Sequence, residues 1–440
     1  MTRKQIEQRQ YFRAIERLTE RELDRELTIA YREMIMSLSQ HLMENLIDYR
    51  SRKPEYPLYV VLMTIIIGII FGANDVQSIE THVKNNPSKV RALLGMVREK
   101  YPRMPSDTTM ERVLCNLNDV ELLTAICEWS DSTFLSKSSD SLRHVAIDGK
   151  ACRAALEKIS GLTYPPFILN AFDGATGSIV AQMSINRKTN ELGVLPQLID
   201  TIGNLNGIVI TTDAFASHPH IMADIDEHGG VIIMPSKGNQ GGIHYAVNTF
   251  LNDAFLDMPE KFTTFHDKDD GIYAHGRICY RTYSLISENV GELFVGTDYE
   301  GLVSSIGFVK RVTQHVMREK QTGELVCTSV SVEELAYLIN SSDLSVEQFA
   351  KYVREHWSAC EVIHYLLDTE LDEDRCRVHT GYGMQNFSLL RKVAVAILKA
   401  IQMKIKRASL GTIREFLQSC GGIPADYCSK SISSPDTQAS

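Results

Sequence analysis

Two aspartates each follow a short apolar run of the kind that forms a buried strand. Asp148 ends the run 143–148, and Asp213 ends the run 207–213. If these strands are neighbours, their carboxyl ends meet at the crevice where open α/β sheets place their binding sites. Two carboxylates there would suit magnesium ions, which prefer oxygen ligands and can hold both oxygens of a phosphodiester during cleavage. The alternative is that both aspartates only cap strand ends or turns, as Asp-Gly pairs commonly do.

The order of the predicted elements decides whether those two strands are neighbours. Alternating and apolar runs, separated by glycine and proline, predict strands at 143–148, 167–173, 178–185, 207–213 and 230–235. Helices are predicted at 190–202 and 217–228. In this β-β-β-α-β-α-β order, a three-stranded meander followed by a crossing helix puts the first strand beside the fourth. The sequence therefore predicts an α/β fold with a mixed sheet.

Other segments predict further parts around this core. Apolar residues at three- and four-residue steps in the charged N-terminal stretch are typical of amphipathic helices. The strand–helix rhythm stops after the fifth strand, and one helix is then predicted over 346–368 and another over 386–406. The predicted parts are an all-α domain, a core in two pieces, a β-rich insertion and a disordered tail: 1–135, 140–240 with 346–410, 241–345, and 429–440.

Composition and charge restrict the class of protein. The chain has 440 residues, of which 44% are hydrophobic and 23% charged, with a net charge of −9. That charge argues mildly against a nucleic acid partner, although a local basic groove is sufficient. Nine cysteines without C-x-x-C spacing predict a reduced, cytoplasmic protein with no structural zinc. The apolar run at 58–73 is short for a membrane span and predicts a buried helix, and the polar N-terminus is unlike a signal peptide.

Several motifs, in order, resemble one family of transposases. Ile147-Asp148-Gly149-Lys150, followed by Arg153, resembles the I-D-G-K-x-x-R motif of the H-repeat-associated (ISAs-type) branch of DDE transposases. Further blocks resemble the same family along nearly the whole chain: 170–173 (NAFD), 188–191 (KTNE), 212–214 (TDA), 237–240 (KGNQ), 275–277 (HGR) and the spaced residues of 356–386 that begin with HW. One block alone would be a weak signal, whereas this many in order are specific.

The resemblance implies a function and a site. It implies a ribonuclease-H-like nuclease and strand transferase that uses Mg²⁺ or Mn²⁺ on double-stranded DNA at the ends of its own mobile element. It also implies an insertion that contacts DNA near the cleavage site, and a homodimer on the DNA. By position, Asp148 and Asp213 are the first two catalytic acids and the metal ligands. The motif residues expected to contact DNA are Lys237, Arg277, His356 and Trp357. An isolated basic residue among them could equally be solvated surface.

The third acid is where the chain departs from the family pattern. The family has H-W-x-I-E-N, whereas this chain has HWSACE over 356–361, so that Cys360 stands at the acid position and Glu361 one place later. One helical residue turns by about 100° and rises 1.5 Å. We therefore expect Cys360 to face Asp148 and Asp213 and Glu361 to point away. A local irregularity, such as a π-bulge near Ser358, would bring Glu361 to the acids instead.

Three functions stay open on the sequence alone. An active transposase would use Glu361 as a displaced third acid. A catalytically impaired relic would retain binding of DNA ends but lose cleavage, because the thiol of Cys360 is a poor ligand for magnesium. An unrelated two-metal nuclease is the third possibility, and the KGNQ and HW blocks argue against it.

Overall fold

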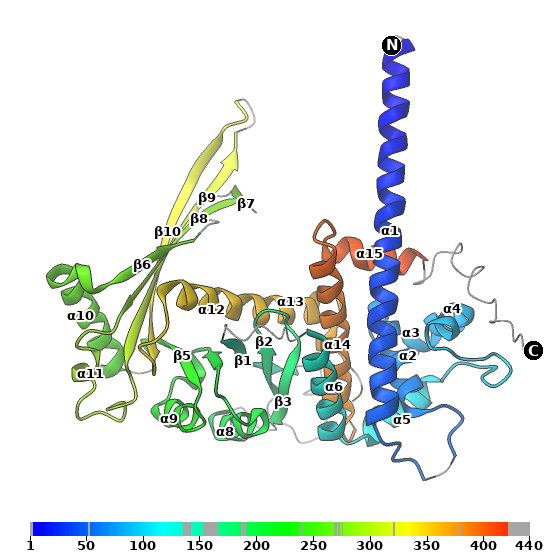
Figure 1. Cartoon of the computed structure of the whole chain (residues 1–440), viewed down its shortest axis with the longest axis horizontal. Helices are drawn as coiled ribbons and strands as arrows, with labels where there is room; N and C mark the ends of the chain where they lie inside the picture. The colour runs from blue at the N-terminus through cyan, green and yellow to red at the C-terminus, as the bar shows by residue number, and fades with distance from the viewer. Residues whose placement is uncertain are drawn as a thin grey trace, which may run out of the picture. The chain divides into compact units, whose positions relative to one another are not determined.

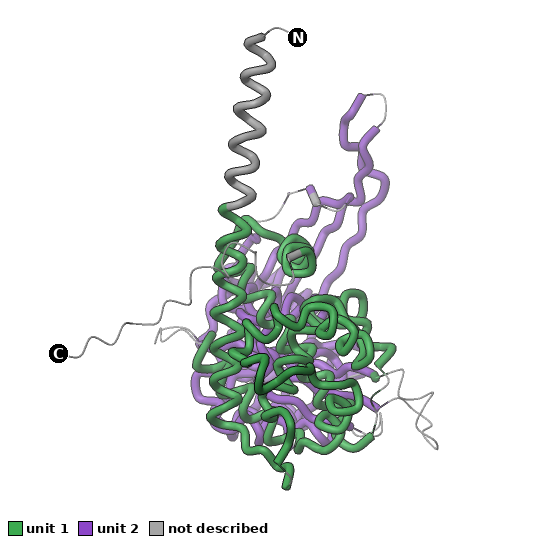
Figure 2. Tube along the Cα trace, turned by 90° about the vertical axis from the view of Figure 1, so that its right-hand side faces the viewer, with its two compact units in different colours: residues 1–135, 152–165, 363–440 green, residues 136–151, 166–362 purple. Residues whose placement is uncertain are grey.

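The chain divides into two compact units, which are coloured separately in Figure 2. The helical unit comprises 1–135, 152–165 and 363–440, and the sheet unit comprises 136–151 and 166–362. The computed structural model (Figure 1) describes residues 3–51, 53–134, 142–152, 166–185, 191–238, 241–267, 271, 273–274, 276–319, 322–376, 378 and 380–420. Outside the described residues lie the predicted tail at 429–440 and the motif residues Arg153, Lys188, Thr189, Asn190, Asn239, Gln240, His275 and Arg377.

The helical unit is built around the apolar run predicted to be a buried helix. Its described helices are α1 (Arg3–Asn45), α2 (Leu58–Ile70), α3 (Val76–Asn85), α4 (Pro87–Leu93), α5 (Asp107–Asn116), α6 (Asp119–Phe134), most of α13 (Glu361–Thr369), α14 (Gly383–Lys404) and α15 (Leu410–Cys420). In α2 every residue except Tyr59 is buried, which confirms the prediction. No helix within the described residues is both long and apolar enough to cross a membrane.

Helix α14 belongs to the core of the helical unit. It packs against α1, α2, α5 and α6. The buried side-chain amide of Asn386 donates to the backbone oxygens of Leu114 at 2.9 Å and Leu117 at 2.8 Å, which ties α14 to the end of α5. We predicted that 346–410 belongs to the sheet core, and the division into units differs, because 363–440 groups with the N-terminal helices. The apolar face of a helix predicts that the helix packs against another element, but it does not identify that element.

The sheet unit contains one mixed sheet. Its described strands are β1 (Arg143–Ala151), β2 (Phe167–Asp173), β3 (Ile179–Ile185), β4 (Ile208–Thr212), β5 (Val231–Ser236), β6 (Thr263–His266), β7 (Tyr273–Ala274), β8 (Arg277–Ile286), β9 (Ser305–Arg318) and β10 (Leu325–Ile339). Their order is β3-β2-β1-β4-β5-β10-β9-β8-β6, with β7 on β8. Only the β1–β4 and β4–β5 pairs among these are parallel. The 3-2-1-4-5 order of the first five strands confirms the predicted ribonuclease-H-like fold.

Helices cover both faces of this sheet. Helices α8 (Glu191–Ile202), α9 (Pro219–Glu227) and α10 (Gly242–Asp257) contribute to the apolar core on one face. Helix α12 (Val346–Ala359) packs on the other face, over β1, β4, β6 and β8. Its Phe349 is fully buried between Tyr283 and Tyr337, with ring centroids 6.2 and 5.5 Å away. A Cβ at Gly307 would lie 2.4 Å from the Phe349 ring, so only glycine allows this approach.

The stretch between β5 and α12, predicted as a β-rich insertion, is mainly β but differs in two ways. It begins with the helix α10 and includes a second short helix, α11 (Val290–Leu293). Its strand β10 pairs with β5 over Ala336–Ile339, so that β8, β9 and β10 continue the core sheet, as Figure 1 shows. The insertion is therefore an extension of the central sheet.

Candidate active site

Asp148 and Asp213 lie at matching places on neighbouring parallel strands. The β1–β4 ladder ends with Ile147 opposite Thr212, and each aspartate is the next residue. We predicted that strand β1 ends at Asp148. It instead continues to Ala151, because it stays paired with β2. Side chains alternate between the faces of a sheet. Both aspartates are therefore on the face that α12 covers.

The local hydrogen bonds of Asp148 and Asp213 bear on the alternative that these residues only cap strand ends or turns. Asp213 caps a short 3-10 helix, η2 (Ala214–Ala216), by accepting the amide of Phe215 at 3.0 Å. Oδ1 of Asp148 accepts the amide of Gly149 at 2.8 Å. Both contacts use one carboxylate oxygen, and a carboxylate has two oxygens with about four acceptor positions. Capping and ligand binding are therefore compatible at both residues.

The two acids line one pocket of about 200 Å³ within the sheet unit. Its polar lining residues are Asp148, Thr211, Thr212, Asp213, Lys237, His356, Trp357, Cys360 and Glu361. Thr212 is buried, and its hydroxyl has no hydrogen-bond partner in the structure. Buried polar groups without a partner are rare and call for an explanation. Strand alternation puts this hydroxyl on the face opposite to Thr211 and Asp213, so an ordered water on that other face would provide one.

Helix α12 runs in the same direction as β1 and brings its C-terminal end towards the acids. The Tyr352 hydroxyl donates to the oxygen of Leu142 at 3.4 Å, and Glu355, further along the helix, contacts His144, further along the strand, at 3.0 Å. The end of α12 therefore lies towards Asp148. Three of the four expected DNA contacts, Lys237, His356 and Trp357, are gathered in the pocket by this arrangement.

The helix predicted over 346–368 is wrong as a single element. Helix α12 ends at Ala359, Cys360 is its C-cap, and α13 begins at Glu361. No glycine or proline lies between Ser358 and Val362, and nothing in the local sequence explains the break. The irregularity is small, because Cys360 keeps right-handed helical angles and its amide still bonds to the oxygen of His356 at 2.9 Å. Both residues line the pocket: Cys360 is 1% exposed, and Glu361 is exposed.

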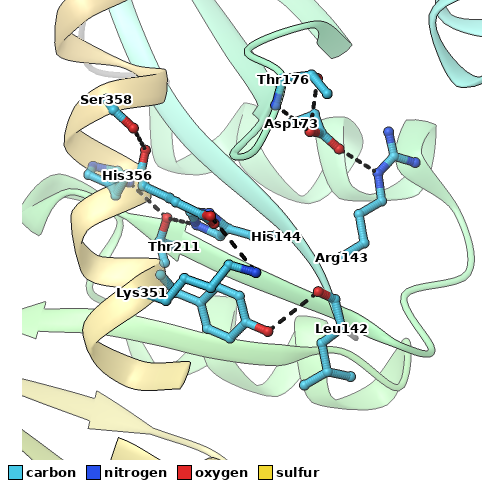
Figure 3. A network of polar contacts seen from close by, with 11 residues as sticks. Leu142, Arg143, His144, Asp173, Thr176, Thr211, Lys351, His356 and Ser358 are labelled. Atoms are coloured by element: carbon cyan, nitrogen blue, oxygen red, sulfur yellow. Dashed lines mark hydrogen bonds and ion pairs between the residues drawn. The ribbon is translucent and has the colours of Figure 1, made fainter. Parts of the chain in front are cut away.

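A chain of buried and partly buried hydrogen bonds under the pocket was missed by the sequence reasoning. His144 lies between Glu355 and Thr211, with Nδ1 3.0 Å from Glu355 Oε2 and Nε2 2.8 Å from Thr211 Oγ1. Thr211 Oγ1 is also 2.8 Å from Nδ1 of His356 (Figure 3). The available signal was strand alternation, since His144 stands four residues before Asp148 on the same face.

A larger pocket of about 580 Å³ adjoins the first, and Lys237, Trp357 and Glu361 line both. It adds the basic residues Arg281, Arg311 and Arg354. These are partly balanced by acids: Arg281 and Arg354 both pair with Asp267, the former at 3.5 Å, and Arg311 pairs with Glu333 at 3.4 Å. The sequence reasoning missed Arg281 and Arg354, although Arg281 follows Arg277 by four residues on one strand.

Arg277 and Tyr337 complete the placement of polar groups around the pockets. Arg277, the fourth expected DNA contact, is exposed on β8 and lines neither pocket. Strand alternation puts it on the same face as Arg281. Tyr337 lines both pockets, and burial, with a smaller effect of Tyr283, raises its pKa well above the ordinary value of 10.0. Its phenol is therefore neutral and cannot act as a base near pH 7.

Comparison with known proteins assigns the chain to a family. Residues 141–397, more than half of the chain, match the family described as "Transposase DDE domain", and residues 40–130 match the one described as "DDE_Tnp_1-associated". The chain belongs to the DDE transposase family. This confirms the resemblance seen in the motifs. Family membership makes the chain a transposase-type nuclease whose substrate class is DNA.

Relatives of this family member include putative transposases of Escherichia coli. The "Putative protein YbfL" and the "H repeat-associated putative transposase YhhI" of strain K12 are each 26% identical over 386 residues, covering 84% of the chain and 94% of the relative. The "Putative transposase YncI" of strain O157:H7 is 25% identical, covering 86% and 95%. A solved structure of a piggyBac transposase synaptic complex with hairpin DNA covers 89% of the chain and 78% of its own, at 9% identity and a TM-score of 0.38, which carries no argument.

Proposed function

We propose that the chain is the DNA transposase of an insertion sequence, which cleaves DNA strands at the ends of its element and transfers them to a target. The observation that carries the proposal is the placement of Asp148 and Asp213. Each directly follows the last residue of the parallel ladder between β1 and β4, and both line one pocket. Carboxylates so placed can act on one phosphodiester group, as strand cleavage and strand transfer both require.

The donor set of the pocket fits Mg²⁺ or Mn²⁺ in kind. Both ions prefer oxygen ligands, and magnesium is commonly held by one or two carboxylates together with substrate phosphates. Asp148 and Asp213 would hold the ion between the two strands that carry them. Within the described residues no three His, Cys, Asp or Glu side chains form a metal-binding group. When bound, the ion would stabilise charge that develops on the phosphate oxygens.

Glu361 is the third catalytic acid in this proposal, displaced by one position from the family pattern. It lines the pocket of both aspartates, and its carboxylate is the ligand type that the ion prefers. The alternative is a catalytically impaired relic that retains DNA-end binding. The presence of Cys360 in the same pocket, at the family's acid position, favours this alternative. The two versions differ only in cleavage.

DNA contacts are proposed at the rim of the two pockets. Lys237 and Trp357 line both pockets and are exposed, so that a DNA strand entering either one would meet them. Arg277 would bind the backbone further along the face of β8. His356 lines only the pocket of the acids. By analogy with the family, the chain would act as a homodimer on double-stranded DNA.

The test is a metal-dependent cleavage assay on duplex DNA that carries the sequences flanking the gene on each side. We expect cleavage with Mg²⁺ or Mn²⁺, and its loss in Asp148→Asn and Asp213→Asn with DNA binding retained. Asp200→Asn is the matched control, because this aspartate is exposed on α8. If the wild type binds the DNA ends without cleaving them, and Cys360→Glu restores cleavage, the result would instead support the relic. Neither binding nor cleavage in any variant would overturn both versions.

A further inference from the structure

Strand β10 has one side that is unpaired over most of its length. Strand β9 pairs with it from Leu325 to Ile339, apart from a bulge at 327–329, whereas β5 pairs only with 336–339. Within the described residues no strand lies on the β5 side of 325–335, and Figure 1 shows β9 and β10 extending beyond β5. Every residue of 325–335 is exposed or half-buried. We call this side of 325–335 the free edge.

The pairing with β5 shows which backbone groups point to the free edge. The amide of Ile232 on β5 donates at 2.8 Å to the side-chain oxygen of Asn340, the residue after β10, so this amide points towards β10. Alternate residues of a strand direct their N–H and C=O groups to the same side. The even-numbered residues of β5 therefore face β10, where even-numbered residues are opposite them. The register is regular from 329 onward, so Val330 and Val332 direct their backbone groups to the free edge.

The sequence of the free edge favours pairing with another strand. Proteins commonly protect an edge strand with lysine, with proline or with a bulge. The run LVCTSVSV over 325–332 has no charged residue, glycine or proline, and its valines and threonine favour strands. The bulge at 327–329 leaves the part from 329 to 335 regular. This regular part presents unpaired N–H and C=O groups that an added strand can bond.

The charges of β8, β9 and β10 argue for a protein at this edge and against DNA. The free edge contains no Lys or Arg that could neutralise a phosphate. Arg281 and Arg311 are opposite each other on β8 and β9 and line the larger pocket, on the face that α12 covers. On the other face Val332, Val312 and Tyr280 form a row across three strands, and Val332 and Tyr280 are 55% and 42% exposed. The surface next to the free edge is therefore apolar.

The free edge of a second copy fits as the added strand. Two-fold pairing places the strand antiparallel to itself, and like charges directly opposite each other would destabilise it. A register centred on Ser331 puts Val330 of each copy opposite Val332 of the other, so that residues whose backbone groups face the edge form the hydrogen-bonded pairs. The acids at 333–334 are then opposite Ser329 and the bulge, and no acid is opposite another acid. The edge is complementary to itself in this register.

We propose that the free edge of β10 pairs antiparallel with the free edge of a second copy of this chain, so that the sheets of two copies become one. The inference rests on the homodimer of the proposed function and names its surface. Antiparallel pairing about a two-fold axis keeps equivalent side chains on the same face. Arg281 and Arg311 of both copies are therefore on one face of the joined sheet, where a single DNA molecule can contact both pairs.

The first test detects the pairing and its register by crosslinking of the full chain. Ser331 is opposite itself in a pair without hydrogen bonds, whose Cα atoms are about 4.5 Å apart, within the range of a disulfide. We expect Ser331→Cys, with the exposed Cys327 replaced by serine, to form a disulfide-linked dimer under mild oxidation. Ser329→Cys in the same background is the matched control, because the two copies of this residue are offset by about 13 Å along the strands. No dimer in Ser331→Cys, or equal amounts in both variants, overturns the proposal.

The second test measures the strength of self-association by sedimentation velocity over a range of protein concentrations. Val330→Lys puts a lysine twice at the centre of the pairing and should raise the dissociation constant of the dimer by about 10-fold or more. Val295→Lys is the matched control, because Val295 is a valine of the same unit that is 68% exposed, outside the free edge. Circular dichroism checks that both variants are folded. A monomeric wild type, or a dimer that Val330→Lys does not weaken, overturns the proposal.

Cleavage of DNA ends separates the failure of this interface from the failure of the proposed function. If Val330→Lys weakens the dimer and the wild type and Cys360→Glu both leave DNA ends uncut, the interface stands and the proposed function is overturned. If the wild type cleaves with Mg²⁺ and its dimer is as strong in Val330→Lys, the function stands and the copies meet at another surface.

Discussion

Asp148 and Asp213 are the first residues beyond the parallel ladder that joins β1 to β4, each following one residue of its last pair, Ile147 and Thr212. Strands in a sheet are about 5 Å apart, and the alternation of side chains puts both carboxylates on one face. Carboxylates on strands this close can both reach the ions of a two-metal site, which are about 3.5–4 Å apart. The pairing of the strands alone therefore brings together two like charges, which a divalent cation would stabilise.

Arg281 and Arg277 should each contribute to DNA binding through the phosphate backbone. Each phosphate that a basic side chain neutralises adds about 0.9 to the steepness of log K against log salt concentration, so the loss of one contact makes the slope shallower by that amount. We expect Arg281→Gln and Arg277→Gln to weaken binding to duplexes of any sequence and to lower the slope by about one each. The measurement is a salt titration of DNA binding by fluorescence anisotropy. Lys261→Gln, at a surface lysine that lines neither pocket, is the control. An unchanged slope in Arg281→Gln would show that its pairing with Asp267 is structural only.

Gly174→Ala should destabilise the sheet unit. Its Cβ would lie 2.0 Å from Nδ1 of His144, and that ring cannot move away easily because both of its nitrogens are hydrogen-bonded. Overpacking of this kind costs about 1–3 kcal/mol, measurable by denaturant unfolding. Gly193→Ala is the matched control, since its Cβ meets nothing within 4 Å and a helical alanine stabilises by up to about 1 kcal/mol. Equal stability of the two variants would contradict the close approach to His144.

The helical unit should lose stability as the pH falls below neutrality because of His82. Its ring stacks on Phe71 at 4.7 Å, and burial, with a smaller effect of Lys89, lowers its pKa below the ordinary value of 6.5. The unfolded chain then takes up a proton that the folded chain does not, so the stability present above pH 6.5 declines as the pH falls through the lowered pKa. His82→Phe keeps the stacking and should flatten this decline. The buried Trp129 would report unfolding of this unit in a Trp357→Phe background.

His228 provides a control, because its pKa shift, and therefore its effect of pH on stability, has the opposite sign. The backbone oxygen of Asp224, 2.7 Å from Nδ1, is the main cause that raises the pKa of His228 above 6.5. Its contribution is therefore present below pH 6.5 and is lost as the pH rises through the raised pKa. His228→Gln should reduce stability at acid pH and not at alkaline pH. The same trend in both variants would contradict the assignment of the two pKa shifts.

Local patterns in the sequence were enough for the core strands and the two aspartates. Alternation and turn residues predicted all of β1 to β5, and their order predicted that β1 lies beside β4. The helix α10 was missed within a stretch taken as β-rich, although its buried Val247, Leu251 and Ala254 follow helical spacing. Pairing between distant segments left no local signal. The continuation of β1 to Ala151 depends on β2, and the packing of α14 depends on helices more than 250 residues earlier, as the bonds of Asn386 show.

The site was less accessible to the sequence, because it depends on how the α12 helix packs against the sheet. The motif spacing identified Cys360 and Glu361 as competitors, and we expected only one of them near the acids. Both line the pocket, together with Val353, His356 and Trp357, at the spacing of one helix face. The arginines around Asp267 come from β8 and α12, so their meeting is likewise a property of the fold.

Paired substitutions at Cys360 and Glu361 determine whether Glu361 acts as the third catalytic acid. Glu361 offers hard oxygen ligands in the pocket of Asp148 and Asp213, whereas the thiol of Cys360 suits neither Mg²⁺ nor Mn²⁺. We expect Glu361→Gln to lower cleavage on the order of 100-fold or more, the usual effect of losing one group that stabilises transition-state charge. Cys360→Ala should leave the rate nearly unchanged. The measurement is the single-turnover cleavage rate with Mg²⁺ and with Mn²⁺.

The relic predicts the opposite pattern, and Cys360→Glu, added to the wild type and the two variants above, separates the two versions. If Cys360 has replaced the acid, wild-type cleavage is very weak and Cys360→Glu raises it by orders of magnitude, while Glu361→Gln changes nothing. DNA-end binding should survive in all variants because it depends on other residues. Glu347→Gln, which removes the same charge from the first turn of α12, controls for the loss of a carboxylate. Wild-type cleavage that persists in both Glu361→Gln and Cys360→Ala would contradict both versions, since neither provides a third acid from elsewhere in the chain.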